Sequence, residues 1–401
     1  MDNSYITMPK GYKATGVCAD LKGEGKLDFA LVYSESPATV SGVYTSNLVK
    51  GHSLQRSIKL IANGKAKRAI AINAKNANAC VGPVGETDAD EIAKAIAEKL
   101  GVDSDEVLTA STGVIGIRLP VEKMISHVPA LVSSLGSDEQ SAHNAELAMM
   151  TTDTVPKEVS AKIALQDEKE VTVAAMAKGS GMIHPNLATM ICVFTTDAKI
   201  EKDLLDKMLK NAVSHTFNRV SVDGDTSVCD SVMVFANGES GVEIKDGTED
   251  AEIFQDTLIS LSTDLARMIA CDGEGATKLL EVIVKNAATE EDAKLVVTAI
   301  ARSPLCKTAI FGEDANFGRF ITAAGYSGAS FDPNKLDMYV GDLLVCKDGD
   351  ATITDEEAAA KLLAEHDITV TVDLNAGSFE DRMFTCDFSY DYVKINGSYR
   401  S

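Results

Sequence analysis

A hydroxyl residue, Thr189, stands between a glycine-rich loop and an apolar run, and this placement suits self-cleavage. Residues 178–194 read KGSGMIHPNLATMICVF, and the apolar run at their end is typical of a buried strand. The Thr189 hydroxyl could attack the carbonyl of Ala188 and shift the acyl group from nitrogen to oxygen. Hydrolysis of that ester would cut the chain and leave Thr189 with a free α-amine. The pKa of such an amine is roughly 7.7–8, which suits a general base near neutral pH.

A less specific interpretation of the same stretch is the usual one for this spacing. Glycine-rich loops often lead into strands, and a threonine at that point commonly caps a turn or pairs within the sheet. The pattern of residues alone therefore leaves both interpretations open, and the other features of the chain must decide between them.

The composition limits the class of protein and the kind of partner. The chain has 401 residues, of which 45% are hydrophobic and 24% charged, enough for a sizeable core and two domains. Its net charge of −22 argues against nucleic acid or an anionic membrane surface as a partner. No apolar run approaches the roughly 20 residues of a membrane span, and residues 1–16 show no targeting pattern, so we expect a cytoplasmic protein.

Cysteines and acidic residues offer no convincing metal site. The eight cysteines are scattered without a CxxC pair, so we expect buried free thiols in place of disulfides or zinc ligands. Asp223 and Asp225 suggest calcium, but the ligand order of an EF-hand and its closing glutamate are missing. We therefore expect no metal.

Short apolar runs alternate irregularly with amphipathic stretches, and this predicts an α/β fold with mixed sheets, unlike a doubly wound pattern. A hairpin is expected over 160–176 and long helices over 201–217 and 250–270. Over the last hundred residues we expect strands at 337–346, 367–374 and 382–396, with a helix at 355–365.

Two strings make the chain similar to a known family. KGSGMIHPNLATM at 178–190 and CDGEGATK at 271–278 resemble segments of the ornithine acetyltransferases, also called the bifunctional glutamate N-acetyltransferases of arginine biosynthesis. The resemblance runs from GVCADLKG at 16–23 to the last residue. It implies a layered αββα core over residues 1–285, of the N-terminal-nucleophile-like type, and a smaller C-terminal α/β domain over 286–401.

The activity implied by the resemblance is acetyl transfer from N2-acetyl-L-ornithine to L-glutamate through an acetyl-Thr189 intermediate. Cleavage between Ala188 and Thr189 would give an alpha chain, 1–188, and a beta chain, 189–401, that assemble as an α2β2 heterotetramer. No cofactor is implied. The resemblance leaves open whether acetyl-CoA is a second acetyl donor, which would add amino-acid N-acetyltransferase activity.

Roles for individual residues also follow from the resemblance. Thr112 and Gly113 would form the oxyanion hole. The residues that would bind substrate are Thr151 (with Thr152 as the alternative), Lys178, Thr189, Glu274, Asn396 and Ser401. Lys178 would bind the substrate carboxylate and Glu274 its ammonium group.

Each of these residues also has an ordinary structural interpretation. Thr112–Gly113 could be a plain turn, Glu274 a solvated loop carboxylate, and the C-terminal tail a frayed end. Two other functions remain compatible with the sequence: an N-terminal-nucleophile aminopeptidase of related fold, and an amino-acid-binding protein that never cleaves. The chain also departs from the family where Ala74–Lys75 replace the usual Ser-Gly.

Overall fold

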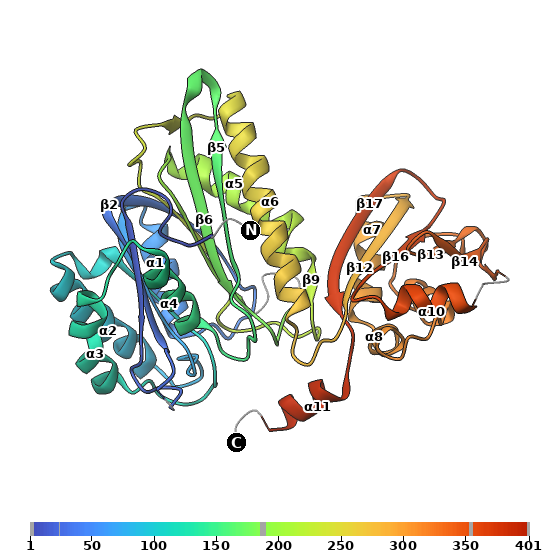
Figure 1. Ribbon diagram of the computed structural model, residues 1–401, viewed down its shortest axis with the longest axis horizontal. Coiled ribbons are helices and arrows are strands. Elements are labelled where there is room, and N and C mark those ends of the chain that lie inside the picture. The colour runs from blue at the N-terminus through green and yellow to red at the C-terminus, as the bar shows by residue number, and fades with distance from the viewer. Residues whose placement is uncertain (1–3, 24, 185–189, 353–355, 399–401) are drawn as a thin grey trace. The chain divides into compact units, whose positions relative to one another are not determined.

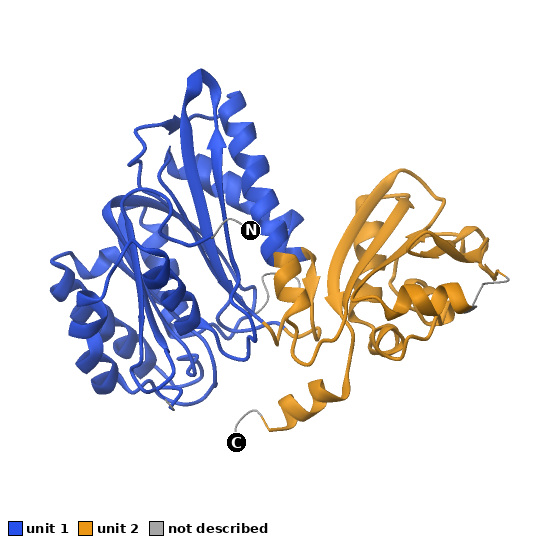
Figure 2. Ribbon diagram, viewed as in Figure 1, with its two compact units in different colours: residues 1–179, 186–218, 226–265 blue, residues 180–185, 219–225, 266–401 orange. Residues whose placement is uncertain are grey.

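Two compact units make up the chain, each with its own sheet and helices (Figures 1 and 2). The computed structural model describes residues 4–23, 25–184, 190–352 and 356–398. Unit 1 comprises residues 1–179, 186–218 and 226–265, and unit 2 comprises 180–185, 219–225 and 266–401. The domain boundary expected near residue 285 falls inside a strand of unit 2, β12 (Leu279–Ala287).

Unit 1 contains one large mixed sheet with helices beside it. Its strands are β1 (Tyr12–Val17), β2 (Phe29–Tyr44), β3 (Lys67–Asn73), β4 (Val107–Ser111), β5 (Glu158–Ala164), β6 (Glu170–Lys178), β7 (Ile191–Thr196), β8 (Lys199–Ile200), β10 (Ser231–Ala236) and β11 (Glu243–Ile244). Its helices are α1 (His52–Ala62), α2 (Val84–Leu100), α3 (Val121–Ser133), α4 (Glu139–Met149) and α5 (Lys202–His215), and it holds most of α6 (Glu249–Cys271).

The strand order explains how two layers arise from one sheet. The order is β4-β3-β2-β10-β7-β6-β5, with β1 also pairing with β2, and β8 pairs separately with β11. The 16-residue strand β2 is long enough to pair with β1 and β3 along its first part and with β10 along its second. Parallel pairs (β3 with β4, β10 with β7) stand among antiparallel ones, so the predicted mixed sheet is confirmed.

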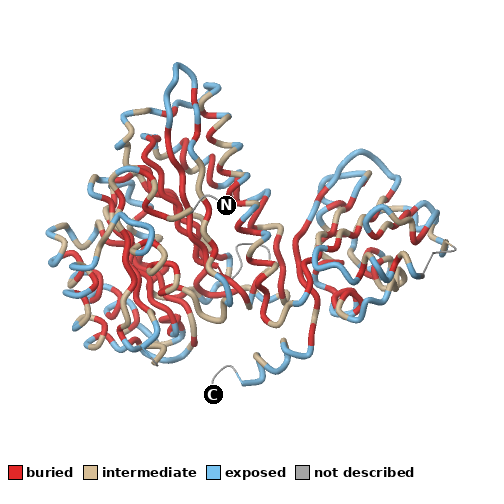
Figure 3. The backbone as a smooth tube through the Cα atoms, viewed as in Figure 1, coloured by how far each residue is buried: buried red, intermediate tan, exposed pale blue. Residues whose placement is uncertain are grey.

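The strands of unit 1 contain many buried residues (Figure 3), and the alternating direction of their side chains builds the layers. Ile70 and Ile72 of β3 point into a core that also contains Val193 of β7 and Met233 of β10, so this core lies between the two halves of the sheet. On the opposite face of β3, small side chains pack against α2 and α3. Helix α5 packs on β2 and β10. Together these contacts give the predicted αββα layering.

Unit 2 is built on a seven-stranded sheet in the order β15-β14-β13-β16-β12-β17-β9. Its remaining strands are β9 (Val220–Ser221), β13 (Asp337–Val340), β14 (Leu343–Lys347), β15 (Asp350–Ala351), β16 (Asp367–Asp373) and β17 (Phe379–Cys386). Its helices are α7 (Glu290–Arg302), α8 (Pro304–Phe311), α9 (Phe317–Gly325), α10 (Glu356–Ala364) and α11 (Tyr390–Gly397). Apolar residues of α7, α8 and α9 form one core with the sheet.

The expectation of a strand over 382–396 is wrong in its second half. Strand β17 ends at Cys386, and helix α11 begins at Tyr390. Ser389 explains the change, because its side chain accepts a hydrogen bond from the Asp391 N–H and caps the helix. The apolar residues of 382–396 therefore do not continue one alternating pattern.

Within the described part of the chain, no helix combines the length and the apolar character needed to cross a bilayer.

Candidate active site

One buried carboxylate, that of Asp153, contacts two of the residues in unit 1 that the sequence pointed to, Thr151 and Lys178. Its Oδ2 accepts the Thr151 N–H at 2.9 Å. Its Oδ1 accepts the Gly179 N–H at 2.6 Å and Lys157 Nζ at 2.9 Å. Lys178 Nζ lies 3.8 Å from Oδ2. The structure thus places Thr151 and Lys178, expected substrate ligands far apart in sequence, around a single side chain.

The two neighbouring lysines explain how the Asp153 carboxylate tolerates burial. The side chains of Asp153 and Lys157 are fully buried, and that of Lys178 is 3% exposed. Burial by itself would raise the pKa of Asp153, but the charges of Lys178 and Lys157 and the two backbone N–H groups hold that pKa well below its usual range. Asp153 is therefore a carboxylate at neutral pH, and its negative charge faces two buried ammonium groups.

Sheet register fixes where Lys178 stands. Lys178 is the last residue of β6 and pairs with Ile191, the first residue of β7. Thr189 is two residues before Ile191 in the chain. Backbone pairing therefore holds Lys178, at the end of β6, opposite the first residue of β7, the strand that follows the expected cleavage point.

The expected oxyanion residues follow β4. The Thr112 N–H donates to the Asn73 carbonyl at 3.0 Å, so this N–H is already engaged within the unit. The Thr112 hydroxyl and the Gly113 N–H make no hydrogen bond with the described residues. Gly113 has φ 129, and a Cβ there would lie 2.2 Å from the Lys75 carbonyl carbon, so the position requires glycine. The donors left for an oxyanion are a hydroxyl and one backbone N–H.

Asparagine side chains hold the neighbouring loop in place. The Asn73 amide donates to the Asn76 carbonyl, and the Asn76 amide donates to the carbonyls of Ile117 and Arg118. The Asn78 amide donates to the Gly85 carbonyl. These amides are therefore used in folding the loop, as asparagine side chains commonly are in turns.

Asp230 is a site feature that the sequence analysis missed. It is buried, and its Oδ1 accepts the N–H of Met190, the residue that follows Thr189, at 3.1 Å. The available signal was an acidic residue placed directly before the apolar strand β10. That signal is weak, because nothing in the sequence indicates which strand lies beside it.

In unit 2, two expected substrate ligands meet directly. Glu274 lies in the loop after α6 and is 7% exposed, so its interpretation as a solvated carboxylate is wrong. Asn396 of α11 donates from Nδ2 to Glu274 Oε2 at 2.8 Å. A Cβ at Gly181 would lie 2.3 Å from the carboxyl carbon of Glu274. Gly181 therefore allows the carboxylate to lie directly against the backbone of the glycine-rich loop.

A second carboxyl group of unit 2, that of Asp223, binds the two residues that follow Gly181. Asp223 accepts the N–H groups of Met182 and Ile183 at 2.6 and 3.0 Å. Burial raises the pKa of Asp223 to about 6, although these backbone donors oppose the rise. Met182 has φ 57, an uncommon conformation for a non-glycine residue. The two hydrogen bonds therefore fix a turn that a free chain would rarely adopt.

His184 is the histidine nearest in sequence to the expected cleavage point. Its Nδ1 lies 3.1 Å from Ser221 Oγ. Burial, together with the charge of Arg302, lowers the pKa of His184 to about 4. At neutral pH the His184 ring is therefore uncharged.

Several expected residues lie outside the described part of the chain. These are Ala188, Thr189 and Ser401. The other expected residues fall into two sets: Thr112, Gly113, Thr151 and Lys178 in unit 1, and Glu274 and Asn396 in unit 2.

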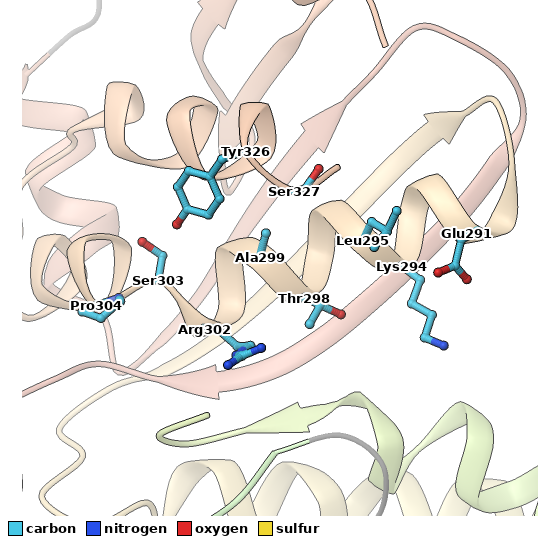
Figure 4. Close-up of a pocket in the computed structure, with 10 residues that line it drawn as sticks. All are labelled: Glu291, Lys294, Leu295, Thr298, Ala299, Arg302, Ser303, Pro304, Tyr326 and Ser327. Atoms are coloured by element: carbon cyan, nitrogen blue, oxygen red, sulfur yellow. The ribbon is translucent and has the colours of Figure 1, made fainter. Parts of the chain in front are cut away.

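A pocket of about 450 Å³ opens on the surface of unit 2 beside α7 (Figure 4). Its lining is Glu291, Lys294, Leu295, Thr298, Ala299, Arg302, Ser303, Pro304, Tyr326 and Ser327. None of the expected site residues belongs to this lining, so we do not count this pocket as part of the candidate active site. Among the described residues no group of three or more His, Cys, Asp or Glu side chains is arranged to hold a metal ion.

Comparison with known proteins adds independent findings. The model of the ArgJ family matches residues 13–401. The arginine biosynthesis bifunctional protein ArgJ of Caldanaerobacter subterraneus subsp. tengcongensis is 48% identical over 401 residues, covering 99% of this chain and 98% of that protein. The glutamate N-acetyltransferase of Methanocaldococcus jannaschii is 43% identical over 404 residues, covering 98% of each.

A solved structure is also similar. The crystal structure of the arginine biosynthesis bifunctional protein ArgJ of Bacillus halodurans shows 40% sequence identity and a TM-score of 0.49. The match covers 51% of this chain and 96% of that one.

The Asp153 cluster gives a prediction about stability. Asp153→Asn keeps the size of the side chain but removes the buried negative charge that Lys157 and Lys178 both face. We expect a loss of about 3–5 kcal/mol in the free energy of unfolding, measured by urea denaturation at pH 7. The control is Glu86→Gln, which breaks an exposed pair with Lys59 and should leave stability close to wild type. An Asp153→Asn protein as stable as this control would contradict the electrostatic account.

His184 gives a prediction about pH. Because its folded pKa is about 4 and its ordinary value 6.5, the unfolded chain binds the proton more readily between these values. Folding stability conferred by neutral His184 is therefore present above pH 6.5 and lost as pH falls towards 4. Relative to His184→Asn, the wild type should lose about 1–2 kcal/mol between pH 7 and 4, after allowance for solvent screening. A difference that stays constant with pH would show that His184 titrates normally.

Proposed function

Because the chain belongs to the ArgJ family, we propose that it transfers an acetyl group from N2-acetyl-L-ornithine to L-glutamate. The products would be L-ornithine and N-acetyl-L-glutamate, in arginine biosynthesis. The observation that carries the proposal is that two charged residues expected to bind substrate are buried: Lys178, beside Asp153 in unit 1, and Glu274 in unit 2, which accepts a hydrogen bond from Asn396. An ammonium and a carboxylate kept out of water are the groups needed to bind a free amino acid.

The proposed nucleophile is Thr189, released by self-cleavage. An acyl shift from nitrogen to oxygen would move the Ala188 carbonyl onto the Thr189 hydroxyl, and water would hydrolyse the ester. The new α-amine has an ordinary pKa of roughly 7.7–8, so a substantial part of it is unprotonated near neutral pH. It can therefore take the proton of its own hydroxyl, and no histidine is needed as base.

Acetyl transfer then proceeds in two halves. The Thr189 oxygen attacks the acetyl carbonyl of N-acetylornithine while its proton passes to the α-amine. The tetrahedral intermediate collapses, its C–N bond breaks, and ornithine leaves with that proton. In the second half, the amine of glutamate attacks the acetyl-Thr189 ester, N-acetylglutamate departs, and the proton returns to the Thr189 oxygen. This is a ping-pong sequence through a covalent intermediate.

The oxyanion donors in this proposal are the Thr112 hydroxyl and the Gly113 N–H. The Thr112 N–H is given no such role, because it donates to the Asn73 carbonyl. Donors fixed by the fold stabilise charge that develops in the transition state without having to reorganise. The loop that carries them is held by Asn76, whose side-chain amide donates to the carbonyls of Ile117 and Arg118.

Charge complementarity supports the substrate assignments. Lys178 would bind the carboxylate of the substrate and Glu274 its ammonium group. The amide of Asn396, which donates to Glu274, fixes the orientation of that carboxylate. Thr151 would contribute a further contact, because its backbone is held by the carboxylate that also faces Lys178. The side chain of Ser401 completes the proposed set.

Further parts of the proposal come from the family resemblance. They are an α2β2 assembly of cleaved chains and the absence of a cofactor. The proposed cytoplasmic location comes from the sequence, which has no apolar run long enough for a membrane span and no targeting pattern in residues 1–16. Whether acetyl-CoA also donates acetyl to glutamate is a separate question, which a competition between N-acetylornithine and acetyl-CoA would answer.

Self-cleavage provides the primary test. Purified protein should run on a denaturing gel as two bands, each about half of the 42.5 kDa chain, and N-terminal sequencing of one should read Thr-Met-Ile-Cys. Thr189→Ala lacks the hydroxyl and should remain whole and inactive. Thr189→Ser should cleave and transfer acetyl more slowly, since it lacks the methyl group that restricts χ1. An active wild type that runs as one uncut band would overturn the proposal.

The covalent intermediate can be examined in the same protein. Incubation with N-acetylornithine in the absence of glutamate should place one acetyl group on the peptide that begins at Thr189, detected by mass spectrometry. Initial-rate plots with both substrates should be parallel. Intersecting plots, without acetylated peptide, would indicate direct transfer within this same family assignment.

Glu274 gives a second test of the substrate site. Glu274→Gln keeps the shape of the side chain and loses its charge, so self-cleavage should persist while kcat/KM for N-acetylornithine falls. Loss of a buried charged contact is worth about 2–5 kcal/mol, or roughly 30- to 5,000-fold. The control is Glu98→Ala on the exposed face of α2, which should leave both activities intact. Unchanged kinetics in Glu274→Gln would remove Glu274 from the site.

A further inference from the structure

Three side chains of unit 2 that the proposed acetyl transfer does not use form a hydrogen-bonded chain: Cys271, His366 and Asp367. Cys271 is the last residue of α6, and Asp367 is the first residue of β16. Cys271 Sγ lies 3.8 Å from His366 Nε2, and His366 Nδ1 lies 2.5 Å from Asp367 Oδ1. A thiol, an imidazole and a carboxylate in this order are the parts of an activated cysteine nucleophile.

The end of α6 and the start of β16 hold these side chains together through two neighbouring contacts. Arg267 stands four residues before Cys271 on α6, so both lie on one face of the helix. Arg267 forms an ion pair with Oδ2 of Asp367, the carboxyl oxygen that does not contact His366. The backbone contributes as well, because the Leu279 N–H donates to the His366 carbonyl at 2.8 Å. The imidazole is therefore fixed between the thiol and the carboxylate, and all of these residues belong to unit 2.

The carboxylate decides which ring nitrogen of His366 can act as a base. A carboxylate only accepts hydrogen bonds, so Nδ1, which faces Asp367, carries the ring proton. Nε2 of the neutral ring is then an acceptor, and it faces the Cys271 thiol. Transfer of the thiol proton to Nε2 gives a thiolate beside an imidazolium, and the thiolate is the nucleophilic form of cysteine.

The position of Cys271 at the end of a helix makes the histidine necessary for such activation. The C-terminal end of a helix carries partial negative charge, which disfavours a thiolate. Reactive thiols commonly stand at a helix N-terminus or beside a cation. Because Cys271 has the unfavourable helix end, the positive charge must come from a neighbour, and protonated His366 supplies it.

Exposure separates Cys271 from most other cysteines of the chain. All eight are free thiols, and five of them are buried, so the expectation of buried free thiols is confirmed for these five only. Cys271 and Cys18 are half-buried, and Cys80 is exposed. The side chains of His366 and Asp367 are 59% and 51% exposed, so a small reagent can reach them. Cys18 and Cys80 make no side-chain hydrogen bond with the residues that the structure describes, which makes them internal controls.

We propose that Cys271 is a site of reversible thiol modification, at which a small disulfide forms a mixed disulfide with the protein. His366 Nε2 takes the thiol proton, and the Cys271 sulfur attacks one sulfur of the small disulfide. The S–S bond of that disulfide breaks, and its second sulfur leaves as a thiolate that takes the proton from His366. One disulfide is consumed and one is formed, so no further oxidant is needed. Cys271, His366 and Asp367 have no part in the proposed acetyl transfer, so this modification does not depend on it.

A purely structural contact between Cys271 and His366 leads to a different expectation. A thiol with the usual pKa of about 8.5 is roughly 3% ionised at pH 7, so complete ionisation raises the reacting fraction about 30-fold. A less basic thiolate is also a weaker nucleophile, which reduces that gain. We therefore expect Cys271 to react about tenfold faster than an ordinary thiol, whereas a structural contact gives no increase.

The experiment follows the reaction of the purified full-length protein with excess dithiodipyridine, a small uncharged disulfide, at pH 7. Samples are quenched with acid over time, and peptide mass spectrometry gives the rate of mixed-disulfide formation at Cys18, Cys80 and Cys271 separately. Cys271 should react about tenfold faster than both controls, although Cys80 is the more exposed. A reducing agent should then remove the modification. A rate at Cys271 no higher than the rate at Cys18 would overturn the proposal.

Two variants test the neighbours of the thiol. His366→Gln keeps a polar side chain at this exposed position and removes the base, so the rate at Cys271 should fall to that of Cys18 or below. Asp367→Asn removes the carboxylate that fixes the ring proton on Nδ1, and it should lower the rate at Cys271 by about threefold or more. Cys18 and Cys80 should react as in wild type in both variants.

The outcome with His366→Gln is decisive. Unchanged reactivity of Cys271 in this variant would show that the imidazole does not activate the thiol, contrary to the proposal. If His366→Gln does not fold, Asp367→Asn decides in the same way: a fall confined to Cys271 supports the proposal, and a rate equal to wild type overturns it.

Discussion

The buried carboxylate of Asp153 is the interaction on which the site of unit 1 depends. It accepts two backbone N–H groups and faces two buried ammonium groups, those of Lys157 and Lys178. Charges removed from water are tolerated when they are paired and hydrogen-bonded, and each member of such a cluster is unfavourable without the others. The cluster therefore fixes the loop before β5 to the end of β6. A lysine that the sequence alone would leave in solvent becomes a buried cation at a defined position.

Carboxyl groups that bind backbone N–H groups recur along the segment that contains the expected cleavage point. Asp153 binds Gly179 and Asp230 binds Met190 within unit 1, while Asp223 binds Met182 and Ile183 within unit 2. Side-chain acceptors suit the residues on either side of the expected cleavage point, because irregular backbone lacks the regular hydrogen-bond partners that a strand or helix provides. Their protonation states differ: two lysines keep Asp153 ionised, whereas burial favours the neutral form of Asp230. Carboxyl groups that make similar hydrogen bonds thus differ in the protonation state that their surroundings favour.

The sequence predicted the mixed α/β class well because hydrophobic periodicity is a local property. The hairpin expected over 160–176 appears as β5 and β6, and the helix expected over 250–270 as α6. The error at 382–396 was also local in origin, since the capping serine at 389 lies inside an apolar stretch that resembles a continuing strand. The motif strings led to Lys178 and Glu274, and a threonine before an apolar run supplied a self-cleavage hypothesis on chemical grounds. No pattern in the sequence indicated that Asp153 and Asp230 would organise their surroundings.

The sequence by itself determined the types of chemistry available: a hydroxyl before a buried strand, a lysine at the end of another, and an acidic residue between glycines. The tertiary structure decided which of these groups are buried and what they contact. Asp230 meets Met190 from 40 residues away because β10 lies beside β7 in parallel register, and Asn396 reaches Glu274 across 122 residues because a capped helix follows β17. Strand order and register are set by packing of the whole core, since every strand must place its apolar face inward at once. Contacts of this range, and the protonation states that burial imposes, are therefore properties of the folded chain.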